Sequence, residues 1–220
     1  MDGNIMTPVD LETYTRQRYN AVGDLFFPEA EIFNFFYKAQ CELASEFRCI
    51  RRIYTTPSVS GQRAYDFPEN SIAIARATYD GEKMTPNDFV IDDAYTGNDE
   101  NIATTGRPEF YQQWGQTFYL RPVPDTSSLD IKLYTWDMPS VPTTTGTLDV
   151  PAVYHIFLSD YALHAMCLQD KDFGLADRYM QAWQANKEQV KKLEKQRLTA
   201  DRFVTVKDVD DFYPESRYSR

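Results

Sequence analysis

Hydrophobic positions repeat at helical spacing in the first fifty residues. Thr7, Pro8 and Asp10 form the pattern of a helix start, in which threonine caps, proline takes the first position and the acid completes the cap. The sequence therefore predicts a helix over about residues 8–24, and a second proline opens another over about 28–52. The apolar positions of the second helix step by three and four residues, which predicts one buried face: Ile32, Phe36, Ala39, Leu43, Phe47 and Ile50.

In the middle of the chain the period shortens to the alternation of β-strands. Short runs rich in β-branched and aromatic residues predict strands at 53–56, 63–67, 72–79, 110–114, 117–121 and 129–136. Asp80-Gly81 and Gly115-Gln116 predict two hairpin turns, because two-residue loops need positive φ angles. We expect residues 93–106 to form an exposed loop and residues 137–148 a connector.

Helical signals return after Pro151. Residues 152–169 are apolar almost all round, as in a helix at the centre of a bundle, and a last helix runs to about residue 199. Its predicted inner face carries Ala176, Tyr179, Trp183, Val190 and Leu193.

These elements predict an α+β fold. Two N-terminal and two C-terminal helices form an antiparallel helical bundle, with an inserted antiparallel β domain and an extended C-terminal arm. The predicted domains are a helical bundle of 8–53 with 150–199, a β-rich insertion of 54–149, and an arm of 200–220.

The predicted arm has no helical or strand period of useful length, yet it keeps four aromatic residues. They are Phe203, Phe212, Tyr213 and Tyr218. Disordered tails are usually poor in aromatic residues. We expect the arm to become ordered on a partner, with these side chains as its anchors; a frayed terminus is the alternative.

Charge and composition narrow the classes of function. The 220 residues carry 23 Lys and Arg against 33 Asp and Glu, a net charge of −10, which argues against a groove that grips phosphates. Residues 171–200 are the basic exception, with seven basic and four acidic residues. A solvated or subunit-facing helix end explains them better than a grip on DNA. No apolar run is long enough to span a bilayer, and the acidic N-terminus does not resemble an export signal.

Catalytic and metal-binding signals are weak. Nucleotide-binding glycine motifs and the nucleophile elbow are missing, so we expect no enzyme activity and no cofactor. His155 and His164 are nine residues apart, and His164 with Cys167 would give only two ligands of a metal site. We interpret the three cysteines, Cys41, Cys49 and Cys167, as small buried hydrophobic residues of a protein in a reducing compartment. Acid pairs at Asp92-Asp93, Asp99-Glu100 and Asp210-Asp211 are typical of solvated loops.

The β region holds more aromatic residues than its core needs, which indicates a contact surface for proteins or sugars. A carbohydrate-binding or hydrolytic module using Trp114, Trp136 and the loop acids therefore remains an alternative.

The order of motifs resembles a known family. It runs through Tyr65-Asp66-Phe67-Pro68, a hairpin over 77–84, Thr117 to Asp125, a strand over 129–136, and Val150-Pro151 before the closing helices. This order, over roughly residues 8–200, is similar to that of the head–tail adaptor (connector) proteins of short-tailed double-stranded DNA phages, of the tail tubular protein A type.

The resemblance implies a structural virion protein of the neck or tail, assembled in the host bacterial cytoplasm. It implies a ring, usually of twelve copies, seated between the phage portal protein and the tail nozzle protein, with double-stranded DNA passing through. Such a role needs no active site, and from the residues themselves we expect no membrane partner, no cofactor and no metal. A neck, collar or tail-decoration protein is the alternative within the virion.

Overall fold

The computed structural model describes residues 6–23, 26–87 and 104–205. Contacts divide the chain into two compact units. The helical unit comprises Met1–Ala39, Pro142–Leu148 and Ala152–Arg220, and the β unit comprises Gln40–Val141 and Asp149–Pro151.

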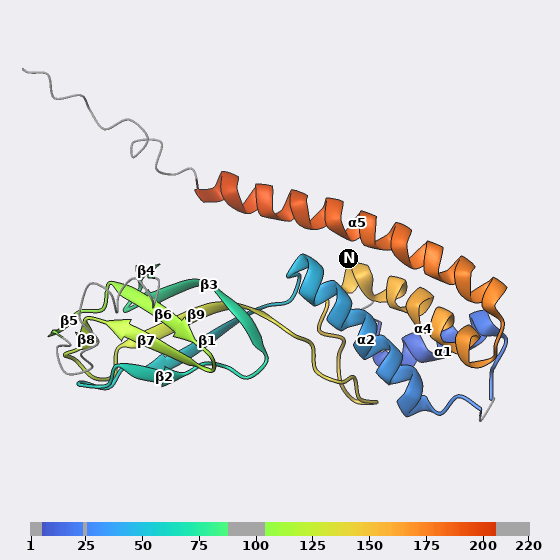
Figure 1. Ribbon diagram of the computed structural model, residues 1–220, viewed down its shortest axis with the longest axis horizontal. Helices are drawn as coiled ribbons and strands as arrows, with labels where there is room; N and C mark the ends of the chain where they lie inside the picture. The colour runs from blue at the N-terminus through green and yellow to red at the C-terminus, as the bar shows by residue number, and fades with distance from the viewer. Residues whose placement is uncertain (1–5, 24–25, 88–103, 206–220) are drawn as a thin grey trace, which may run out of the picture. The chain divides into compact units, whose positions relative to one another are not determined.

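The helical unit contains α1 (Pro8–Tyr19), the first part of α2 (Glu29–Phe47), the short 3-10 helix η1 (Ala152–Tyr154), α4 (His155–Gln169) and α5 (Phe173–Thr205) (Figure 1). α4 packs along α5, and α1 packs on α4. The core side chains come from all four helices and include Leu11, Ile32, Phe36, Leu158, Leu163, Met166 and Trp183.

Local chemistry sets the ends of the first two helices. The capping box of α1 forms as predicted, with Thr7 Oγ1 accepting from the Asp10 N–H and the Asp10 carboxylate accepting from the Thr7 N–H. α1 ends at Tyr19 because Asn20 adopts the left-handed conformation, at φ 58°. α2 ends at Phe47 before Arg48, which also has positive φ. Both helices are therefore about five residues shorter than predicted.

The described residues of the β unit form two sheets. The large sheet has the strand order β1-β9-β3-β4-β6-β7-β2, and the small one pairs β5 with β8. The strands are β1 (Arg51–Pro57), β2 (Ala64–Asp66), β3 (Ser71–Tyr79), β4 (Glu82–Pro86), β5 (Thr105–Gly106), β6 (Phe110–Trp114), β7 (Thr117–Arg121), β8 (Val123–Pro124) and β9 (Asp130–Asp137). The core of the unit is an aromatic and aliphatic cluster that includes Tyr65, Phe67, Tyr79, Phe118, Ile131 and Leu133.

Both predicted hairpins are confirmed. Tyr79 pairs with Glu82 across Asp80-Gly81, whose φ angles of 49° and 83° are those of a type I′ turn. Trp114 pairs with Thr117 across Gly115-Gln116, with Gly115 at positive φ. The alternation predicted for β9 is also confirmed, since Ile131, Leu133 and Thr135 are buried.

The predicted fold, a helical bundle with an inserted antiparallel β domain, is wrong. Helices and strands do separate as in an α+β protein, but the strands form a large seven-stranded mixed sheet that curls. β4 pairs in parallel with β6, and β5 with β8. No turn joins these pairs directly, so sequence motifs could not reveal them. The second part of α2 also belongs to the β unit and not to a bundle.

Candidate interaction surfaces

The residues considered for a metal site serve packing instead. His164 Nδ1 lies 3.0 Å from the Ala176 carbonyl oxygen, which links α4 to α5. Cys167 is fully buried, and burial raises the pKa of its thiol. His155 Nδ1 lies 3.1 Å from the Met6 carbonyl oxygen. Within residues 6–23, 26–87 and 104–205, no cluster of three or more His, Cys, Asp or Glu could hold a metal ion.

The two tryptophans of the alternative carbohydrate site do not lie together. Trp114 ends β6 and is 60 % exposed. Trp136 lies on β9, where the Arg48 guanidinium stacks 4.7 Å from its ring centroid. Two strands, β3 and β4, separate them in the sheet. The loop acids Asp92, Asp93, Asp99 and Glu100 lie outside the described residues.

α5 is the longest helix described. At 1.5 Å per residue its 33 residues extend about 50 Å, while the 15 residues of α4 extend about 22 Å. Figure 1 shows α5 continuing past the N-terminal end of α4. The buried positions of α5 are Ala176, Trp183, Val190 and Glu194. The helix continues for eleven residues beyond Glu194, the last described side chain that is buried.

The inner face of α5 differs from the prediction at its distal end. Leu193 is 39 % exposed, whereas Glu194 is 3 % exposed. The Tyr154 hydroxyl donates to Glu194 Oε1 across 2.7 Å, and Arg197 also donates to this carboxylate. These donors compensate the burial of its charge. Amphipathic spacing alone predicted that Leu193 is the buried residue. Glu194 is buried instead because Tyr154 of η1 and Arg197, one turn later in α5, bind its carboxylate.

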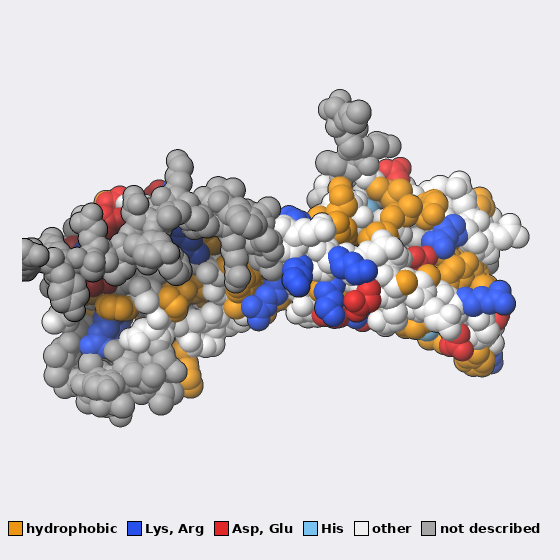
Figure 2. Space-filling model, turned by 90° about the horizontal axis from the view of Figure 1, so that it is seen from above, with side chains coloured by type: hydrophobic (Ala, Val, Ile, Leu, Met, Phe, Trp, Pro, Cys, Tyr) orange, Lys and Arg blue, Asp and Glu red, His pale blue; other side chains and the backbone are white. Residues whose placement is uncertain are grey.

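The outward face of distal α5 is basic. Lys191, Lys192 and Lys195 are exposed on it, and Arg197 is exposed at the border of the buried face. Glu188 pairs with Lys191, and Glu194 pairs with Arg197, along this part of the helix. Figure 2, which views the helical unit from the α5 side, shows Lys and Arg side chains with hydrophobic side chains among them.

A second exposed surface lies at the turn between α4 and α5. The Tyr19 hydroxyl donates to Asp170 across 2.6 Å, and Gln169 donates to Glu31, so this turn lies against the α1–α2 connection. Four exposed hydrophobic residues flank these contacts, and we call them the end patch: Val22, Phe26, Leu168 and Phe173, from 44 % to 73 % exposed. The periodicity of the sequence did not predict the end patch, although its aromatic residues beside turn positions were a signal.

The comparisons with known proteins identify the family. A family model described as SU10 adaptor protein matches residues 6–207. The chain belongs to the SU10 adaptor protein family. The match includes every described residue of both units up to the end of α5. This family match is consistent with a phage head–tail adaptor, and it confirms the resemblance seen in the sequence. A comparison with the curated proteins finds no match.

This SU10 adaptor is thus a structural protein of a bacteriophage. Its family implies a component of the virion neck that associates with other head and tail proteins. Among the residues that the structure describes, no helix combines the length and the apolar character needed to cross a membrane.

The structure describes the side chain of none of the four predicted anchor residues. Phe203 is a residue of α5, of which the structure describes only the backbone at this position. Phe212, Tyr213 and Tyr218 lie outside the described residues. Their role as anchors stays a prediction.

Proposed function

We propose that this SU10 adaptor joins the portal protein to the tail nozzle protein. It acts as a ring, for which the resemblance implies twelve copies, and double-stranded DNA passes through the ring. Family membership supports the adaptor role. The observation that carries the proposal is the length of α5, whose backbone continues for eleven residues beyond Glu194, its last described buried side chain.

A long helix of this kind favours attachment to other chains. Short isolated helices are only marginally stable in water, and helices in proteins gain most of their stability from tertiary packing. A partner that covers the end of α5 would therefore stabilise it. The exposed lysines of distal α5 and the end patch supply a charged and an apolar surface for neighbouring proteins. The predicted arm of residues 200–220 begins inside α5, which runs to Thr205 and not to about residue 199 as predicted. The arm would extend onto the portal or a neighbouring copy, with Phe203, Phe212, Tyr213 and Tyr218 as anchors.

The charge of the chain suits a passage for DNA. Residues 1–170 hold 12 basic and 24 acidic residues, a net charge of −12. An acidic wall repels the phosphate backbone, so DNA slides without being held. In a ring, the negative charge of one chain is multiplied by the number of copies.

Portal binding tests the proposal. The full chain and a chain ending after Thr205 are mixed with the cognate portal, and co-sedimentation is measured. A third chain, with residues 206–220 in scrambled order, is the control for length and charge. We expect the full chain to bind and both altered chains to lose binding. Equal binding by all three would exclude residues 206–220 from the portal contact. No binding by the full chain would overturn the adaptor role and favour a peripheral neck, collar or tail-decoration position.

A further inference from the structure

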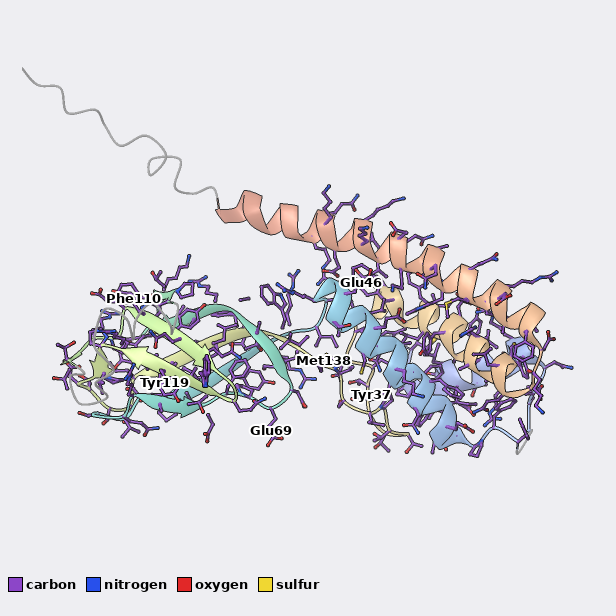
Figure 3. The ribbon with its side chains drawn as sticks, in the orientation of Figure 1. Tyr37, Glu46, Glu69, Phe110, Tyr119 and Met138 are labelled. Carbon is purple, nitrogen blue, oxygen red and sulfur yellow. The ribbon has the colours of Figure 1, made fainter. Side chains whose placement is uncertain are left out.

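The large sheet of the β unit has an open seam between its two edge strands. Among the described residues β1 pairs only with β9, and β2 pairs only with β7. A groove with a volume of about 380 Å³ is lined by both edge strands. Its buried floor is formed by Phe67, Phe118 and Leu133, and Thr55, Asp66 and Glu69 lie exposed along its sides. Figure 3 shows Glu69 projecting from the turn after β2.

The edge of β1 turns unpaired backbone groups toward the open side of the strand. The Asp137 N–H donates to the Ile50 carbonyl and the Ser58 N–H donates to the Leu129 carbonyl, so the even-numbered residues of β1 face β9. Because backbone direction alternates along a strand, Thr55 directs its N–H and C=O away from β9. Thr55 also lines the groove.

The edge of β2 has the same property. The Leu120 N–H donates to the Arg63 carbonyl and the Phe67 N–H donates to the Gln116 carbonyl, so the odd-numbered residues face β7. Asp66 therefore directs its backbone groups away from β7 while it lines the groove. An apolar floor between two exposed strand edges is the form of site that accepts an added peptide strand.

The charge of the groove selects the occupant. Asp66 and Glu69 are exposed and form no ion pair within the described part of the chain. A matching strand needs an aromatic or apolar side chain for the floor and a cation on the same face. In an extended segment, residues two apart share a face, and Tyr218 and Arg220 have this spacing. Both lie beyond residue 207, where the family match ends.

We propose that the seam binds residues 214–220 of a second copy as an added strand. Tyr218 covers the floor of Phe67, Phe118 and Leu133, and Arg220 pairs with Asp66 and Glu69. This inference rests on the proposed function in one respect, since it requires copies to assemble. It assigns the end of the arm to a neighbouring copy.

Peptide binding to the full chain tests the inference. The receptor is the full chain with Tyr218→Ala and Arg220→Glu, so that its own segment does not compete, and the probe is a fluorescent peptide of residues 206–220. We expect saturable binding in fluorescence anisotropy. A Tyr218→Ala or Arg220→Glu peptide should bind at least about tenfold more weakly, and a scrambled peptide should not bind.

Charge reversal in the receptor locates the site. Asp66→Lys with Glu69→Lys should weaken peptide binding by about tenfold or more, whereas Glu109→Lys, an exposed acid before β6 that does not line the groove, should leave it unchanged. Equal effects of both changes, or no peptide binding at all, would overturn the inference.

Sedimentation distinguishes binding of the segment to a second copy from binding within its own chain. Full chains with Tyr218→Ala and Arg220→Glu should self-associate at least about tenfold more weakly than the unaltered chain. Peptide binding with unchanged self-association would overturn the assignment to a second copy. The proposed function has its own readout, because binding to the portal is measured separately.

Discussion

The Tyr154 hydroxyl donates a 2.7 Å hydrogen bond to Glu194 Oε1, which ties η1 to the distal part of α5. Both residues are buried, and Arg197 completes the shell of the carboxylate. This contact lies at the end of the buried face of α5. The position of the helix extension therefore depends on a polar contact as well as on hydrophobic packing.

Replacing Glu194 tests how much this contact stabilises α5. Glu194→Gln keeps the shape but removes the charge that binds Arg197, and it presents an amide N–H₂ where an acceptor stood. We expect the free energy of unfolding to fall by about 1–2 kcal/mol, measured by urea unfolding followed by circular dichroism. Glu188→Gln on the same helix is the control. Its side chain is 66 % exposed, so its effect should stay within about 0.5 kcal/mol. Equal effects would contradict this assignment.

Alkaline pH should weaken the helical unit through two tyrosines. Burial, and then hydrogen bonding to Glu194 or Asp170, raises the pKa of Tyr154 and Tyr19 above the ordinary value of 10.0. Folding thus favours the neutral phenol. Its stabilising effect is complete below pH 10, where both states are neutral, and is lost as the pH rises from 10 toward the folded pKa.

The tyrosine effect is measured by urea unfolding between pH 9 and pH 12. The fall in the free energy of unfolding should be smaller in Tyr154→Phe than in the unaltered chain. Tyr134→Phe, on a half-buried tyrosine of β9 whose hydroxyl makes no hydrogen bond among the described residues, should keep the full fall. A Tyr154→Phe profile identical to the unaltered one would contradict the assignment.

Asp137 should be the most sensitive acid of β9. Its carboxylate is fully buried and accepts from the Tyr54, Ser71 and Thr135 hydroxyls at 2.6, 2.8 and 2.6 Å. Asp137→Asn leaves some of these donors without an acceptor, so we expect a loss of about 2–3 kcal/mol in thermal or urea unfolding. Asp130→Asn, at the exposed start of the same strand, should change stability by less than about 0.5 kcal/mol.

Gly81 tests the first hairpin turn. Its φ of 83° is unfavourable for residues with a Cβ, although a methyl group there would meet nothing within 4 Å. Gly81→Ala should therefore destabilise the β unit by about 1 kcal/mol through backbone strain alone. Gly174→Ala, in the first turn of α5, should be neutral or slightly stabilising because alanine favours helix. The same sign for both changes in thermal unfolding would contradict this account.

Local rules predicted the local elements of this fold. The capping box at Thr7, both hairpin turns and the alternation of β9 each depend on residues close together in the chain. The helix ends at Asn20 and Arg48 were missed because neither residue is a glycine, although both adopt positive φ. Asparagine is the second most common residue at such ends, so Asn20 was a signal that could have been used, whereas arginine gives none.

The missed features depend on contacts between distant residues. The parallel pairing of Thr85 with Phe110 joins strands without a connecting turn, so it left no signal in the sequence. The burial of Glu194 depends on Tyr154, forty residues earlier. The groove between β1 and β2 arises from the curl of the sheet, which no single strand encodes.

Electron microscopy of the purified protein, alone and mixed with its portal, tests the central claim most directly. The proposed adaptor role predicts a closed ring seated on the portal, with a central opening wide enough for duplex DNA. A protein that remains a monomer under both conditions and never joins the portal would contradict it.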